Sequence, residues 1–101
     1  MGKFVKAINL SDCPLGQGKS CELQGKKIAV FNVSGTFHAI DDTCVHRGGP
    51  LGEGDLDGTV VTCPWHGWQY DVTTGVSPVN PAAKVQSFPC KVQGNDVCVE
   101  V

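Results

Sequence analysis

The chain has 101 residues, with eight Lys and Arg against ten Asp and Glu and a formal net charge of -2. This balance gives no electrostatic reason to expect nucleic acid or an anionic membrane surface as a partner. The apolar runs are too short for a transmembrane helix, and the first residues lack a signal-peptide pattern, so we expect a cytoplasmic protein. The length favours one domain. Six Cys in so short a chain indicate a disulfide framework or a metal site, and the cytoplasm favours the metal site.

Short β-branched and aromatic runs between turn residues predict an all-β chain, and no segment carries a helical stripe. In chain order we expect strands at residues 4–8, 19–23, 27–33, 36–40, 59–62, 69–72, 84–92 and 97–101. Ser34 and Gly35 predict a tight turn between the third and fourth of these strands. Pro89 predicts a sheet edge or a bulge, and residues 93–96 predict the turn of a closing hairpin. Stretches rich in Gly and Pro predict irregular loops at residues 42–55, 63–68 and 75–81.

Two of these loops carry metal-ligand types at close spacing. Cys44 and His46 form a C-x-H pair, Cys63 and His66 form a C-x-x-H pair, and sixteen residues separate the pairs. Two thiolates and two imidazoles suit either tetrahedral zinc or a [2Fe–2S] cluster with two Cys on one iron and two His on the other. The cluster is favoured because the surrounding glycines let backbone N–H groups approach inorganic sulfides; these are Gly48, Gly49, Gly52, Gly54 and Gly67.

The segments CVHRGGPLGEG and CPWHGWQYDVTTG resemble the cluster motifs of Rieske [2Fe–2S] domains, and the resemblance extends over essentially the whole chain. It is greatest to the free-standing Rieske ferredoxins of bacterial oxygenase systems. It implies one cluster, with Cys44 and Cys63 on the buried iron and His46 and His66 on the outer iron. The implied fold is all-β, with small antiparallel sheets in a sandwich or incomplete barrel. We expect residues 1–101 to form this single domain, with a cluster-binding subdomain of loops at about residues 42–80.

The chain departs from the Rieske proteins of cytochrome bc-type complexes, which carry a disulfide where this chain has Gly49 and Trp65. Those proteins also place a serine donor to a sulfide where Trp68 stands, while Tyr70 occupies a second donor position. Fewer hydrogen bonds to the reduced cluster imply a reduction potential toward the low end of the Rieske range, about -150 mV. Histidine ligation implies that the potential falls at alkaline pH, because oxidation makes the imidazole N–H more acidic.

The resemblance implies electron transport rather than catalysis. We expect a soluble, monomeric ferredoxin that carries one electron from an NAD(P)H-dependent flavin reductase to a terminal, aromatic-ring-hydroxylating oxygenase, docking transiently at the His46/His66 tip. A non-heme oxygenase is excluded, because its iron needs two further His and a carboxylate and only His38 is left. The alternatives are a small Rieske subunit of a larger reductase, such as NAD(P)H nitrite reductase, and a structural zinc module.

Other residues are given structural interpretations. His38 is expected to be an ordinary strand residue, and Trp65 is expected to cover the cluster. Trp68 is expected either to cover the cluster or to form an apolar patch where a partner docks. Acidic side chains around the first loop are expected either as a solvated rim or as a collar that steers a basic partner; they are Asp41, Asp42, Glu53, Asp55 and Asp57. The cysteines outside the motif are expected to be small buried hydrophobes on strands; they are Cys13, Cys21, Cys90 and Cys98.

Overall fold

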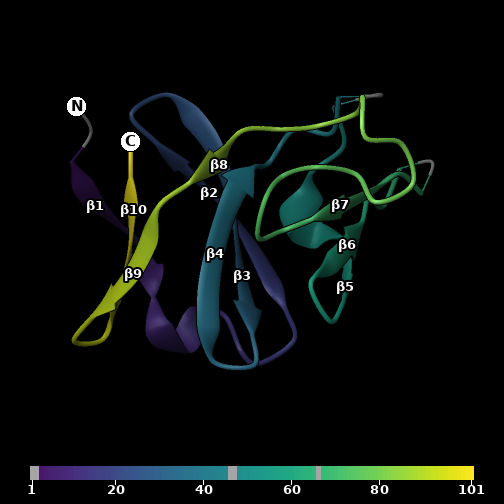
Figure 1. Ribbon diagram of the computed structural model, residues 1–101. Coiled ribbons are helices and arrows are strands. Elements are labelled where there is room, and N and C mark those ends of the chain that lie inside the picture. The colour runs from purple at the N-terminus through teal and green to yellow at the C-terminus, as the bar shows by residue number, and fades with distance from the viewer. Residues whose placement is uncertain (1–2, 46–47, 66) are drawn as a thin grey trace.

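A computed structural model describes residues 3–45, 48–65 and 67–101, which fold into ten short strands and two 3₁₀ turns (Figure 1). The strands form three antiparallel sheets. The first sheet has the order β1-β10-β9, with β1 at Phe4–Asn9, β10 at Asp96–Glu100 and β9 at Cys90–Gln93. A 3₁₀ turn, η1 at Leu10–Asp12, follows β1.

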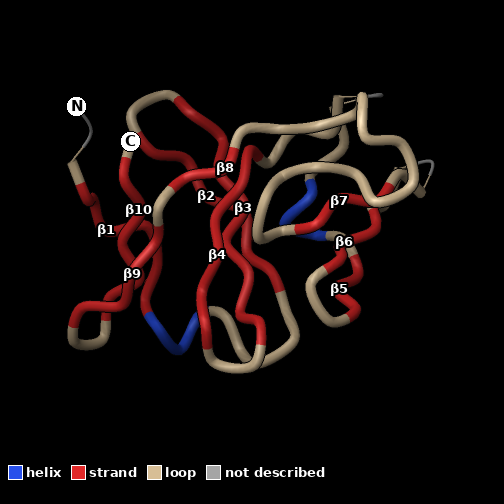
Figure 2. Tube along the Cα trace, in the orientation of Figure 1, coloured by secondary structure: helices blue, strands red, loops and turns tan. Residues whose placement is uncertain are grey.

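The second sheet is the largest and has the order β2-β3-β4-β8. Its strands are β2 at Gly18–Leu23, β3 at Lys26–Val33, β4 at Thr36–Asp41 and β8 at Ser87–Phe88. The third sheet, β5-β6-β7, comprises β5 at Asp55–Asp57, β6 at Val60–Thr62 and β7 at Gln69–Asp71. It lies apart from the first sheet, beyond the second (Figure 1), and the longer loops gather on its side of the molecule (Figure 2).

The apolar run of β3 explains why the second sheet is central. Successive side chains of a strand point to opposite faces, and both faces of β3 are buried. Ile28 and Val30 belong to the core cluster shared with the first sheet, whereas Ala29 and Phe31 belong to the cluster that extends to the third sheet. A strand covered on both sides reads as a continuous apolar run rather than an alternating one, as KIAVFNV does.

Most of the predicted strands are confirmed, including the hairpin across Ser34 and Gly35. The predicted strand at 84–92 is in fact two strands, because Pro89 lies where the chain passes from β8 in one sheet to β9 in another. The predicted loop at 42–55 was wrong at its end. Asp55 begins the short strand β5, whose middle residue Leu56 packs against the core while its two aspartates are exposed.

The η2 turn, at Leu51–Glu53, lies in the same stretch. Within the described residues no helix is long and apolar enough to cross a membrane.

Candidate metal centre

The Cys44 loop, residues 43–50, leaves the end of β4 and closes on itself like a small hairpin. Thr43 forms an antiparallel bridge with Pro50. The backbone N–H of Cys44 donates to the Gly49 carbonyl at 3.0 Å, and the N–H of Gly48 donates to the Cys44 carbonyl at 2.7 Å. Gly48 has a φ of 74°, which glycine adopts at low cost. The local hydrogen bonds therefore hold Cys44 at the base of a closed loop.

The Cys63 loop, residues 63–68, connects β6 to β7 and places the second cysteine. The N–H of Cys63 donates to the carbonyl of Trp68 at 2.6 Å, which closes the loop at its ends. Gly67, with a φ of 75°, provides the left-handed backbone that so tight a reversal needs. Each cysteine thus lies where a strand ends and a short closed loop begins.

The two loops bring Cys44 and Cys63 together in the interior. Their exposed fractions are 1% and 2%, although nineteen positions separate them along the chain. Burial raises the pKa of the Cys63 thiol, and a hydrogen bond with the Cys44 thiol raises it further. Thiolates are the metal-binding form, so a bound metal ion or cluster must displace the protons that burial favours.

Gly49 lies directly against the Cys63 thiol. A Cβ atom at position 49 would come within 2.7 Å of Cys63 Sγ, closer than side-chain atoms approach one another. The same Cβ would meet Trp65 at 3.1 Å. Backbone without a side chain can approach the inorganic sulfides of a cluster closely, and two buried thiols can bind its iron. The residues present therefore fit an iron–sulfur cluster.

Tyr70 lies on β7, the strand that follows the Cys63 loop, and contacts the Cys44 loop. Its hydroxyl oxygen lies 3.4 Å from Cys44 Sγ and accepts a hydrogen bond from the Val45 N–H at 3.3 Å. Its side chain is fully buried. Burial, and next the hydrogen bond with Cys44, raise the pKa of the Tyr70 hydroxyl well above its usual value. The hydroxyl therefore keeps its proton and can donate a hydrogen bond to sulfur. The sequence predicted a donor at this position.

The two predicted histidines, His46 and His66, lie outside the described residues. Trp65, expected as cover, keeps half of its surface exposed, while its first side-chain atoms lie near Gly49. Trp68 instead packs against the core cluster that contains both cysteines. Of the two tryptophans, Trp68 is therefore the better buried, and Trp65 presents a large apolar surface beside the Cys63 loop.

The sequence predicted that Asp42 belongs to a solvated acidic rim or to a collar that steers a partner. Both predictions were wrong for this residue, because it is only 6% exposed. Glu53, Asp55 and Asp57 are exposed and Asp41 is half-buried, as a rim or collar requires. Burial raises the pKa of the Asp42 carboxyl, against the lowering effect of its hydrogen bonds to Gly52 and Ser20. The sequence placed Asp42 in a run of acidic residues and carried no signal that one of them turns inward.

A family model described as "Rieske [2Fe-2S] domain" matches residues 3–89 of the chain. The biphenyl dioxygenase ferredoxin subunit of Pseudomonas sp. (strain KKS102) is 36% identical over 99 residues, covering 96% of this chain and 91% of the relative. The chain belongs to the Rieske [2Fe-2S] domain family.

Among solved structures, this Rieske domain is similar to a chain of the complex of reduced oxygenase and oxidized ferredoxin in carbazole 1,9a-dioxygenase. The TM-score is 0.86 at 33% identity, covering 96% of this chain and 92% of that chain. A chain described as an NADH-dependent nitrite reductase small subunit from Mycobacterium tuberculosis gives a TM-score of 0.90 at 19% identity, covering 100% and 96% of the two chains. At so low an identity the second likeness shows only the fold, which both groups of proteins share.

None of the six cysteines of the Rieske domain is in a disulfide. Cys13, Cys21 and Cys90 belong to or pack against a different core cluster from the one that contains Cys44 and Cys63. Cys13 follows η1 rather than lying on a strand, and its thiol donates to the Gln17 carbonyl at 3.2 Å. Cys21, Cys90 and Cys98 lie on β2, β9 and β10, as predicted, but the prediction of burial was wrong for Cys21 and Cys90, which are only half-buried. Burial is the main cause that raises the pKa of Cys21 to about 11 and that of Cys90 to about 12.

His38 lies on β4, where it pairs with Phe31 of β3. Its position on the framework strand agrees with the structural interpretation made from the sequence.

Proposed function

We propose that this protein is a Rieske ferredoxin that carries one electron to a terminal, aromatic-ring-hydroxylating oxygenase, and that an NAD(P)H-dependent flavin reductase supplies this electron. The observation that carries the proposal is the buried contact of Cys44 and Cys63 across two closed loops of a Rieske domain. The ferredoxin subunit of the biphenyl dioxygenase system and the ferredoxin–oxygenase complex of carbazole 1,9a-dioxygenase support the oxygenase as partner.

We propose Cys44, His46, Cys63 and His66 as the cluster ligands, within a single domain whose residues 42–80 form the cluster-binding subdomain. A [2Fe–2S] cluster, when bound, takes up and releases one electron without making or breaking a covalent bond to a substrate. We expect the protein to act in the cytoplasm as a monomer that docks transiently through its His46/His66 tip.

The described residues contribute to this function by holding the cysteines and controlling their surroundings. The backbone of Gly49 leaves room beside the thiols, and the hydroxyl of Tyr70 is positioned to donate to Cys44 Sγ. Leu51, Val61 and Tyr70 surround the cysteines with fully buried side chains. A dry and preorganised surrounding reduces the solvent rearrangement that accompanies electron transfer.

The test is reconstitution of an electron-transfer chain. The purified holoprotein should be red-brown and give a rhombic EPR signal on reduction. Adding it to a flavin reductase, NADH and a ring-hydroxylating oxygenase should restore hydroxylated product in proportion to its concentration. A colourless protein that contains zinc, or a reduced Rieske cluster that no such oxygenase oxidises, would overturn the proposal.

A matched pair of variants separates the cluster ligands from the other thiols. Cys63→Ser should abolish the EPR signal and the electron transfer. Cys90→Ser, at a half-buried position on β9, should retain both. Loss of the cluster in the Cys90 variant alone would refute the proposed ligand set.

A further inference from the structure

A buried acidic side chain joins the base of the Cys44 loop to a distant strand. Asp42 Oδ1 accepts hydrogen bonds from the Ser20 hydroxyl at 2.9 Å and from the Gly52 backbone N–H at 2.7 Å. Ser20 lies on β2 and Gly52 on η2. Both donors converge on the same oxygen atom, so one carboxylate ties the strand to the turn that ends the loop.

The backbone of Asp42 strengthens this connection. Its N–H donates to the Lys27 carbonyl of β3 at 3.0 Å, and its own carbonyl accepts from the Leu51 N–H at 2.7 Å. The Asp42 side chain and backbone therefore connect β2, β3 and η2. We call the group formed by Ser20, Asp42 and Gly52 the Asp42 clamp.

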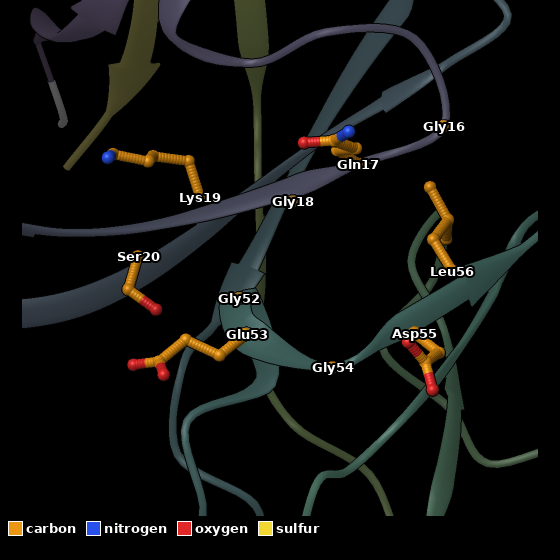
Figure 3. Close-up of a pocket in the computed structure, with 10 residues that line it drawn as sticks. All are labelled: Gly16, Gln17, Gly18, Lys19, Ser20, Gly52, Glu53, Gly54, Asp55 and Leu56. Carbon is orange, nitrogen blue, oxygen red and sulfur yellow. The ribbon is translucent and has the colours of Figure 1, made fainter.

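The packing around Gly52 leaves no space for a side chain. A Cβ atom at position 52 would lie 2.5 Å from Ser20 Oγ and 2.7 Å from the Ser20 backbone nitrogen. Figure 3 shows Ser20 on β2 beside Gly52 on η2, at the edge of the groove that also contains Gly18 and Gly54. The turn thus rests directly on the strand, and the hydrogen bonds to Asp42 hold it there.

Two members of the clamp flank the Cys44 loop, one before it and one after it. Asp42 immediately precedes the bridge between Thr43 and Pro50, and Gly52 follows that bridge by two positions. Among the described residues, the Cys44 loop is held by this base, by Gly49 packed against Cys63 Sγ, and by Tyr70, whose hydroxyl lies 3.4 Å from Cys44 Sγ. A change at the base therefore alters how Cys44 meets Tyr70 and Cys63.

We propose that Ser20 and Asp42 are positioning residues for the Cys44 loop, and that they set the reduction potential and the retention of the cluster through it. This inference rests on the proposed function, because it assumes that Cys44 binds the cluster. Ser20 acts at a distance, through Asp42 and the loop. When the clamp is weakened, the donor from Tyr70 is less well aligned with Cys44 Sγ. The reduced state then loses stabilisation and the potential falls.

The main experiment measures the potential and the rate of iron release to a chelator for Ser20→Ala in the holoprotein. This variant removes one of the two hydrogen bonds to Asp42 Oδ1. We expect a lower potential and a several-fold faster release of iron, with the EPR signal broadened by a less uniform cluster environment. Ser20→Thr keeps a hydroxyl and should restore both quantities. Ser87→Ala, at an exposed serine on β8 of the same sheet, is the matched control and should change neither.

Variants of Asp42 separate hydrogen bonding from charge. Asp42→Asn retains an oxygen that can accept from both donors, so iron release should stay at the wild-type rate. Asp42→Ala removes both bonds and should release iron faster than Ser20→Ala. If Asp42→Ala does not fold, Ser20→Ala and Ser20→Thr still decide the question. Rapid release from Asp42→Asn would show that charge matters rather than hydrogen-bond geometry, and would overturn the inference.

The outcomes for the two proposals are distinguishable. A wild-type protein without a Rieske EPR signal overturns the proposed function and this inference together. A wild-type Rieske cluster whose potential and iron release are unchanged in Ser20→Ala overturns the inference alone.

Discussion

Tyr70→Phe is the most direct test of how the surroundings of the cysteines tune the proposed centre. The substitution removes one hydroxyl and keeps the ring, so the fully buried side chain continues to fill its place. It removes the interaction with Cys44 Sγ at 3.4 Å and leaves the Val45 N–H without the acceptor that it has at 3.3 Å.

The expected shift follows from the strength of that interaction. A hydrogen bond to a charged group contributes about 1.5–3 kcal/mol, and only the part that differs between the oxidised and reduced states changes the potential. If roughly half of the lower value differs between the two states, the reduced state loses about 0.75 kcal/mol. For a one-electron couple a factor of ten, about 1.4 kcal/mol, corresponds to 59 mV. We therefore expect a potential about 30 mV lower than that of the wild-type protein.

The assay is protein-film voltammetry of the two holoproteins at the same pH and salt concentration. Thr62→Val is the control, because it removes a hydroxyl of the neighbouring strand whose partner is the Gln69 side chain rather than a sulfur. It should leave the potential within experimental error of the wild type. An unchanged or higher potential in Tyr70→Phe would refute the reasoning that this hydroxyl stabilises the reduced state.

Three further variants or measurements test the packing around the cysteines. Gly49→Ala places a Cβ within 2.7 Å of Cys63 Sγ, so iron content should fall to a small fraction of the wild-type value. Normal iron loading would show that the bare backbone at position 49 is not required. Leu51→Ala removes a fully buried side chain of the core around the cysteines and should lower the free energy of unfolding by about 2–5 kcal/mol, measured in urea. Because burial is the main cause that raises the pKa of Cys21 to about 11 and that of Cys90 to about 12, both thiols stay protonated at pH 8. From the thiolate fractions, mass spectrometry should show iodoacetamide reacting on the order of 100-fold more slowly with Cys21, and on the order of 1000-fold more slowly with Cys90, than with a free thiol of pKa about 8.5. Rapid labelling would contradict the raised pKa values.

The strand pattern could be predicted well because it rests on local signals. The turn across Ser34 and Gly35 and the continuous apolar run of residues 27–33 identify the central hairpin without any tertiary information. The strand β5 was missed because Asp55–Asp57 has only one apolar residue and follows a stretch that contains Gly52 and Gly54. Such a segment becomes a strand only because β6 supplies hydrogen-bond partners, and that pairing is tertiary.

The sequence by itself determined the class of the site. Two short cysteine–histidine pairs at a constrained spacing, with glycines around them, restrict the chemistry to very few metal centres, because ligand type and loop length decide what can be bound. The tertiary structure alone decided which surrounding residues act on that site. Asp42 looks like one more solvated carboxylate in an acidic run, yet the fold buries it between Ser20 and Gly52. The reason is that hydrogen bonds between segments far apart in the chain leave no periodic or compositional trace in the sequence, whereas ligand spacing does.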